Sequence, residues 1–195
     1  MTILWLRHGE TALNAAKVMQ PADTPLSPRG LAQADAAAAR LKALRPAAIL
    51  SSDMPRARQT AEAVAQATGL TVLTDERLRE RNFGALRGRP WATLGFDPTT
   101  LVEAPEGGES LADFHARCAE AWAFALAHRA ALGGPLLVVS HGLLIHATLQ
   151  RHAHWPTGMQ LPERLTNTSV SIVDAAGPNA MLLVNCSTHL GDQNA

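Results

Sequence analysis

The sequence lacks a net charge. Its 195 residues carry 17 lysines and arginines against 17 aspartates and glutamates. No overall electric field therefore draws the protein to nucleic acid or to an anionic membrane, and we expect neither as a partner. Lysine is also scarce, at positions 17 and 42 alone, so most basic residues are arginines, whose planar guanidinium groups suit phosphate. Any attraction for anions must be local.

Cysteines and long apolar runs are scarce as well. Cys118 and Cys186 lie far apart with no C-x-x-C pair, which argues against a disulfide framework and favours a reducing cytoplasm. No apolar run approaches the roughly 18 to 20 residues of a membrane span. The apolar stretch near the N-terminus is broken by Arg7 and lacks the basic flank of a signal peptide. We therefore expect a cytoplasmic protein.

Short apolar runs alternate with segments of helical periodicity along the chain. Residues 3–6 form a continuous apolar run that ends at Arg7, as a buried strand does before a loop. Ser27-Pro28 is a typical helix start, and Gly69 a typical helix end. The patterns predict strands at 3–6, 48–51, 70–73, 136–139, 170–173 and 181–184, and helices at 27–44, 55–68, 110–132 and 143–151.

This alternation predicts an α/β fold, with one domain over residues 1–195, a mostly parallel sheet and helices on both faces. In such a sheet the ligand site lies beyond the carboxyl ends of the strands. Two histidines fall there, His8 after the first strand and His141 at a strand-to-helix junction. The segment 77–108 is rich in Gly, Pro and charge and predicts a loop over the site, whereas 189–195 is expected to be irregular.

The strongest motif is Leu6-Arg7-His8-Gly9-Glu10-Thr11. Arg-His-Gly alone is a weak signal, but further short motifs follow it in a fixed order. These are Asn14, Pro25-Leu26-Ser27, Ser51-Ser52-Asp53 with Arg56, Glu80 with Phe83-Gly84, Gly107-Gly108-Glu109-Ser110 and Val139-Ser140-His141-Gly142. With them the chain resembles the histidine phosphatase superfamily, branch 1, which also contains the cofactor-dependent phosphoglycerate mutases. The resemblance covers nearly the whole chain and implies a phosphoglycerate mutase-like fold.

The chemistry of phosphoryl transfer fits these residue types. The reaction needs a nucleophile, fixed positive charge and an acid for the leaving group. A histidine attacks phosphorus only when neutral, and the guanidinium groups of Arg7 and Arg56 disfavour the imidazolium form of His8. The same arginines offer planar forks to the phosphoryl oxygens. Spacing alone does not rank His8 against His141 as the nucleophile.

The individual roles come from the resemblance. It implies that His8 is the nucleophile and that His141 stabilises the phosphoryl group electrostatically. It also implies that Glu80 protonates the leaving oxygen and later activates water. We expect no cofactor and no metal, because arginines and histidines neutralise the charge of the phosphoryl group. The residues expected to bind the phosphate of the substrate are Arg7, Arg56 and Asn14. For Asn14, the contact is either with the phosphoryl group or with an adjacent backbone group.

Other polar side chains are predicted to have structural places. These are the surface for Arg58, the core or a helix face for His115 and His146, and a frayed helix end rather than a metal site for His152 and His154. His189 is left open as a residue of the pocket rim. The family often has Gln-Gly where this chain has Gln20-Pro21, so the path of the 17–24 loop is left open, as is that of the lid, residues 85–106.

Three functions are compatible with these residues. The first is a phosphomonoesterase that hydrolyses a small phosphorylated metabolite, such as a sugar, nucleotide or α-ribazole phosphate, through a phosphohistidine on His8. The second is a cofactor-dependent phosphoglycerate mutase, although mutases of this type are longer, with extra lid and tail segments. The third is a non-catalytic phosphate-binding protein, which would be expected to have lost a site residue. We expect the first function, and a homodimer is left open.

Overall fold

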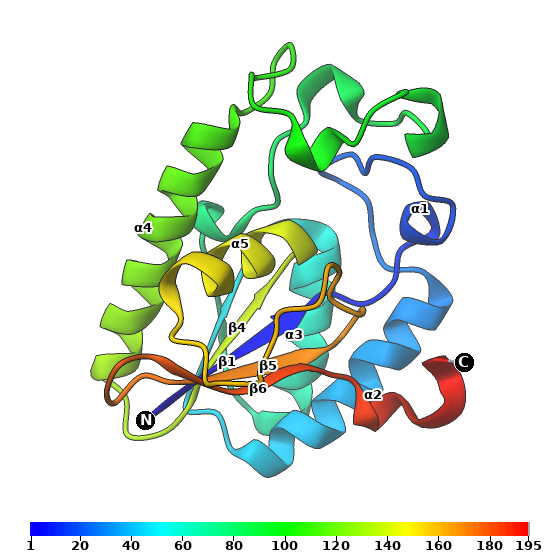
Figure 1. Cartoon of the computed structure of the whole chain (residues 1–195). Coiled ribbons are helices and arrows are strands. Elements are labelled where there is room, and N and C mark those ends of the chain that lie inside the picture. Colours follow the sequence, from blue (N-terminus) through cyan, green and yellow to red (C-terminus); the bar gives the residue numbers. More distant parts are fainter. Residues whose placement is uncertain (195) are drawn as a thin grey trace.

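A six-stranded sheet forms the centre of the fold (Figure 1), in a computed structural model that describes residues 1–194. The strand order is β3-β2-β4-β1-β5-β6. The first four of these run parallel, whereas β5 is antiparallel to β1 and β6 is antiparallel to β5. The strands are β1 (Thr2–Arg7), β2 (Ala48–Ser51), β3 (Val72–Thr74), β4 (Leu136–Ser140), β5 (Val170–Asp174) and β6 (Ala180–Cys186). The predicted mostly parallel sheet is confirmed.

Helices cover both faces of the sheet. Helices α2 (Pro28–Leu44) and α3 (Pro55–Thr68) pack on one face, and α4 (Leu111–Ala130) and α5 (Gly142–His152) pack on the other. A short helix, α1 (Ala12–Ala15), follows the first strand (Figure 1). Among residues 1–194, none of the helices is both long enough and apolar enough to cross a membrane. The predicted α/β layers are therefore present.

Alternating side chains of the central strands supply both cores. Successive residues of a strand point to opposite faces of the sheet. In β1, Ile3 and Trp5 belong to the core beneath α4 and α5, whereas Leu4 and Leu6 belong to the core beneath α2 and α3. The continuous apolar run at 3–6 thus reflects burial on both faces, as expected for a central strand.

Local capping fixes where the helices begin and end. The Ser27 hydroxyl accepts a hydrogen bond from the backbone N–H of Gly30 at 3.0 Å, and Ser110 does the same for Asp113 at 3.1 Å. Helix α3 ends at Gly69, whose φ of 75° is left-handed and favours glycine. These caps define the starts of α2 and α4 and the end of α3.

Three strand ends meet at one edge of the sheet. Arg7 of β1 pairs with Ser140 of β4, and the backbone N–H of His8 donates to the Ser140 carbonyl at 2.9 Å. On the other side of β4, the N–H of Ser52 donates to the Val139 carbonyl at 2.9 Å. The parallel register therefore brings the segments after β1, β2 and β4 together.

The lid and the 17–24 loop are joined by backbone hydrogen bonds. The N–H of Met19 donates to the Arg89 carbonyl at 2.9 Å, and the N–H of Trp91 donates to the Lys17 carbonyl at 2.9 Å. These contacts give the paths that the sequence left open. The segment around the lid contains short 3-10 turns at Glu76–Leu78, Gly84–Leu86, Trp91–Thr93 and Pro98–Thr100.

Two local predictions are wrong, and one short helix was not predicted. The third strand occupies Val72–Thr74 and not 70–73, because its register starts where Val72 pairs with Ile49. Helix α1 was missed, since four residues carry too little periodicity to detect. The segment expected to be irregular forms 3-10 turns over Thr188–Asn194. There Leu190 is buried, at 3% exposure, and residue 195 lies outside the described residues.

Gly30 sets the close approach of α2 to the loop after β1. A Cβ atom added at Gly30 would lie 2.0 Å from the Glu10 carbonyl oxygen, so the backbone would have to move. We therefore expect Gly30→Ala to lower the free energy of unfolding by about 1–3 kcal/mol in a urea titration. Helix propensity alone predicts the opposite sign, a gain of about 1 kcal/mol.

The matched control for this substitution is Gly133→Ala. No heavy atom lies within 4 Å of a Cβ built at Gly133, so this variant should unfold like the wild type. A Gly30→Ala protein as stable as Gly133→Ala would contradict the steric account.

Candidate active site

His8 lies at the end of β1 with one ring nitrogen committed to the backbone. Its side chain is buried, at 2% exposure, and Nδ1 is 2.7 Å from the Gly9 carbonyl oxygen. A carbonyl oxygen only accepts, so Nδ1 carries the proton and donates it. The lone pair of a neutral His8 is then on Nε2, which is left available as a nucleophile.

The charges around His8 favour its neutral form. Burial, followed by the nearby guanidinium groups of Arg56 and Arg7, lowers the pKa of His8 well below its ordinary value. The ring therefore keeps its lone pair at neutral pH. A neutral imidazole is what nucleophilic attack requires.

His141 is the second histidine of the site. Its ring centroid lies 5.1 Å from that of His8, and its side chain has no exposed surface. Nε2 is 2.9 Å from the hydroxyl of Ser52, which can donate to it and leave the ring proton on Nδ1. Nδ1 has no hydrogen-bond partner within the described part of the chain. Burial, then Arg56, then His8 lower the pKa of His141 well below its ordinary value, so it too is neutral.

Arg7 and Arg56 provide positive charge that no ion pair compensates. Arg7 donates from Nη1 to the Leu165 carbonyl, and Arg56 donates from Nη1 to the carbonyls of Pro21 at 3.2 Å and Ala22 at 3.4 Å. Burial lowers the pKa of each guanidinium to about 10, which leaves both charged at neutral pH. Within residues 1–191, neither forms an ion pair, and the Nε atom of each is buried without a partner. An anion is the natural ligand for this pair.

Glu80 is bound to the N-terminus of α5. Its Oε2 accepts from the backbone N–H of Leu143 at 3.0 Å, and Oε1 accepts from the N–H of Leu144 at 3.1 Å. Oε1 also accepts from the N–H of Arg81 at 3.0 Å. The first turn of a helix carries unpaired N–H groups, and a carboxylate stabilises them. Glu80, the predicted proton donor, also lines the cavity that contains His8.

Asn14 contacts the backbone of the loop that carries His8. Its Oδ1 lies 3.4 Å from the N–H of Thr11 and 3.4 Å from the Nδ2 of Asn167, and both groups donate to it. Asn167 also donates to the His8 carbonyl at 3.0 Å. Asn14 itself lines the cavity, which leaves its amide NH₂ as the group available to a ligand.

Thr168, whose backbone is strained, holds the backbone carbonyl of His8. Thr168 has a φ of 53°, a left-handed value that is rare for a β-branched residue, and its N–H donates to the His8 carbonyl at 3.3 Å. Its hydroxyl is 3.2 Å from Nε2 of His189, whose Nδ1 accepts from Arg40 at 3.2 Å. The sequence left open whether His189 lines the rim of the pocket. His189 instead contacts Thr168, which holds the His8 carbonyl, and it is not among the residues that line the cavity. Burial and Arg40 lower the pKa of His189 to about 4.

The cavity extends well beyond the phosphate-binding groups, with a volume of about 1180 Å³. Trp91 of the lid and Phe83, just before the lid, are among the residues that line it. His115 and His146, which were predicted to be structural, do lie on helix faces, but those faces line the cavity. Helical periodicity shows that a face is half-apolar and does not show what that face meets.

The remaining polar residues singled out in the sequence are Arg58, His152 and His154. Arg58 is exposed and forms an i,i+4 ion pair with Glu62 at 3.1 Å. His152 stacks against Trp122 with ring centroids 5.9 Å apart. In the region from residue 1 to 194, no three His, Cys, Asp or Glu side chains come together in a way that could hold a metal ion, at His154 or elsewhere.

Comparisons with known proteins identify the family. A model of the histidine phosphatase superfamily (branch 1) matches residues 3–186. The Yersinia pestis (strain Pestoides F) protein named probable phosphoglycerate mutase GpmB is 36% identical over 185 residues, which cover 89% of this chain and 85% of that protein. The chain therefore belongs to the histidine phosphatase superfamily, branch 1. This membership confirms the family, the fold and the phosphatase class predicted from the sequence.

Solved structures agree with this assignment. Mycobacterial glucosyl-3-phosphoglycerate phosphatase in complex with VO3 has a TM-score of 0.76 and 33% identity, over 89% of this chain and 90% of that one. Bacillus stearothermophilus YhfR has a TM-score of 0.77 and 29% identity, over 93% of this chain and 94% of that one. The sheet and its covering helices thus belong to a shared architecture.

The ring of His8 gives a direct spectroscopic prediction. At a pH of about 6, where an ordinary histidine is largely protonated, we expect His8 to be neutral with its proton on Nδ1. Long-range ¹H–¹⁵N correlation spectra report both properties, with His8→Gln assigning the signals. The unfolded chain binds this proton at a higher pH than the folded chain, so acidification below about pH 6.5 should also lower the free energy of unfolding.

A His8 ring that titrates near its ordinary value would contradict this account. So would a neutral ring with its proton on Nε2, because the lone pair would then face the Gly9 carbonyl.

Proposed function

We propose that the protein is a phosphomonoesterase that hydrolyses a small phosphorylated metabolite through a phosphohistidine on His8. One observation carries the proposal: His8 is held by its Nδ1–H on the Gly9 carbonyl, which leaves Nε2 free. Beside it lie two arginines that have no ion-pair partner among residues 1–191. Catalytic roles are assigned to His8, Glu80 and His141. Arg7, Arg56 and Asn14 bind the phosphate.

The proposed reaction has two displacement steps at phosphorus. In the first, Nε2 of His8 forms a bond to phosphorus, the bond to the leaving oxygen breaks, and Glu80 gives that oxygen a proton. In the second, the Glu80 carboxylate takes a proton from water as the water oxygen attacks phosphorus. The bond from phosphorus to His8 breaks and phosphate leaves. Arg7, Arg56 and His141 stabilise the charge on the transferred group in both steps.

The proposal includes independence from metal ions, because guanidinium groups supply the positive charge that metals supply in other phosphatases. It includes one domain over residues 1–195, which the single sheet supports. It also places the enzyme in the cytoplasm, since Cys118 and Cys186 are both free thiols. A homodimer stays a prediction.

Mutase activity is the second candidate, because the Yersinia relative is named as a probable phosphoglycerate mutase. A mutase must return the phosphoryl group to its product and exclude water. The mycobacterial structure is of a phosphatase, and it matches this chain over a similar share of its length. That likeness favours hydrolysis.

The proposed nucleophile can be tested with 4-nitrophenyl phosphate in the presence of EDTA. We expect the wild type to release phosphate with chelator present, and His8→Ala to lose activity by at least about 10³-fold. Glu80→Gln should lower kcat, because the second step then lacks its base. Arg58→Ala, outside the cavity, is the control with unchanged activity.

Full activity of His8→Ala would exclude the phosphohistidine mechanism.

A panel of phosphorylated metabolites extends the assay to the leaving group. Phosphate release from panel members, without bisphosphate-dependent isomerisation of 3-phosphoglycerate, would favour the phosphatase, and efficient isomerisation would favour the mutase.

A further inference from the structure

Glu80 lies in a segment that no strand or helix supports. Residues 79–83 separate two 3-10 turns and have no regular structure of their own. The carboxylate can meet the first N–H groups of α5 only if the backbone of this segment is held in place. A displacement of about 1 Å is enough to cost a catalytic group much of its effect.

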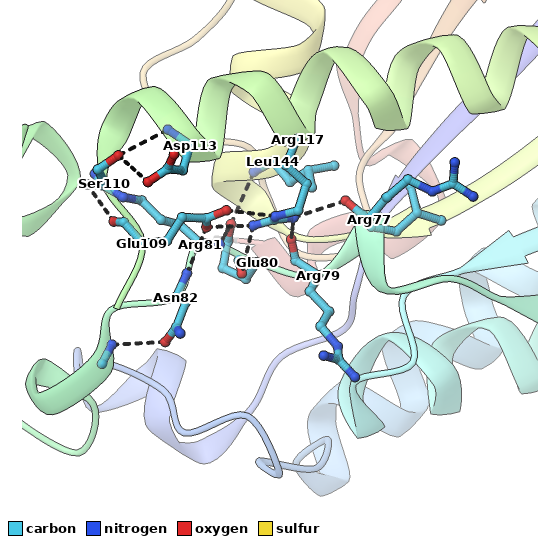
Figure 2. Close-up of polar contacts among 12 residues, drawn as sticks. Arg77, Arg79, Glu80, Arg81, Asn82, Glu109, Ser110, Asp113, Arg117 and Leu144 are labelled. Carbon is cyan, nitrogen blue, oxygen red and sulfur yellow. Dashed lines mark hydrogen bonds and ion pairs between the residues drawn. The ribbon is translucent and has the colours of Figure 1, made fainter. Parts of the chain in front are cut away.

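Arg117 of α4 holds this backbone (Figure 2). Its Nη1 donates to the carbonyls of Arg77 at 3.0 Å and Arg79 at 2.7 Å, and its Nη2 donates to the Glu80 carbonyl at 3.4 Å. One guanidinium group thus spans three carbonyls that lead up to and include the residue carrying the acid. Its planar fork can reach them at once, which an ammonium group cannot do.

Glu109 completes the arrangement on the far side of the guanidinium. Its Oε1 accepts from Nε of Arg117 at 2.8 Å, and its Oε2 accepts from Nη2 at 2.8 Å. Oε2 also lies 3.2 Å from the backbone N–H of Asn82, and the N–H of Glu109 donates to the Asn82 carbonyl at 2.8 Å. The bidentate pair therefore ties the backbone down on both sides of Glu80 (Figure 2).

The helix that carries Arg117 is a rigid base for this contact. Its neighbours Phe114, Cys118 and Trp122 are buried in the core beneath α4 and α5. The pair itself is largely shielded, with side-chain exposures of 19% for Arg117 and 14% for Glu109. Such pairs have well-defined geometry, unlike ion pairs on an open surface.

Arg117 does not touch the reacting groups. It is not among the residues that line the cavity holding His8, whereas Glu80 is. From these contacts we infer that Arg117, closed by Glu109, is a positioning residue that sets the orientation of the Glu80 carboxyl for proton transfer to the leaving oxygen. The inference rests on the proposed role of Glu80.

Leaving-group dependence separates this role from a merely structural one. The 4-nitrophenolate ion is a weak base that departs with little help, whereas the alkoxide of glycerol 3-phosphate needs a proton. The kcat/KM value covers the steps up to formation of the phosphohistidine, so it reports this proton transfer without the later attack by water. We expect Arg117→Lys and Arg117→Met to lower kcat/KM for glycerol 3-phosphate by about 10²-fold, with much smaller losses for 4-nitrophenyl phosphate.

Three further variants serve as references. Glu80→Gln removes the acid and gives the full leaving-group effect. Glu109→Gln opens one side of the bidentate pair and should give a smaller loss of the same kind, so it keeps the test valid if Arg117→Met does not fold. Arg129→Met removes another buried arginine of α4, which donates a hydrogen bond to the Leu132 carbonyl at 2.8 Å. This variant should leave the ratio of the two kcat/KM values unchanged.

The outcomes are distinct. Equal losses for both substrates in the Arg117 variants, beside a selective loss in Glu80→Gln, would overturn the positioning role alone. Wild-type behaviour of Arg117→Lys would also overturn it, because charge and not the fork would then suffice. A Glu80→Gln enzyme without selectivity would remove the acid from the proposed mechanism, and the positioning role would fall with it.

Discussion

Two buried guanidinium groups, which have no ion-pair partner among the side chains of residues 1–191, organise this active site. Arg7 and Arg56 meet carbonyl groups and a thioether sulfur instead of carboxylates. Burying such charges is costly unless other groups compensate them. The two charges lie at the edge of the sheet where β1, β2 and β4 end. The proposed phosphoryl substrate brings the compensating negative charge. Burial, with these two charges added to it, lowers the pKa of His8 and keeps the ring neutral, so the guanidinium groups contribute both to anion binding and to nucleophile activation.

The proton donor depends on a different part of the fold. Glu80 is bound through the start of α5, next to Gly142, where an added Cβ would lie 3.3 Å from Nε of Arg7. The absence of a side chain at Gly142 lets the arginine and the helix start lie close together. The nucleophile and the acid thus reach one cavity from separate elements, β1 on one side and the segment held by α4 and α5 on the other.

The sequence predicts the central part of this arrangement well. The alternating apolar runs place Arg7-His8 and Ser140-His141 at strand ends, and the parallel register brings them together. The ordered motifs identify Glu80 among several neighbouring charges, and Glu80 does line the cavity. The exact roles of these residues stay proposals.

Other features depend on contacts that no local pattern encodes. The five donors of Arg117 go to the Glu109 carboxylate, eight residues away, and to three carbonyls that lie 37 to 40 residues away in sequence. No pattern within the helix marks Arg117 for these contacts. The periodicity of α4 and α5 assigns His115 and His146 to a helix face but does not show that the lid leaves a cavity there. The left-handed backbone of Thr168 cannot be predicted from the sequence either, because tertiary contacts hold it.

Trapping of the intermediate tests the central claim most directly. 4-Nitrophenyl phosphate, whose leaving group departs with little help from an acid, is mixed with Glu80→Gln, in which water attack is slowed. The reaction is quenched in alkali, where phosphohistidine survives. Peptide mass spectrometry then locates the phosphoryl group. The account predicts one phosphoryl group per chain on His8, absent from His8→Ala. Phosphorylation at His141 or another residue, or turnover with no phosphoenzyme at any time, would contradict it.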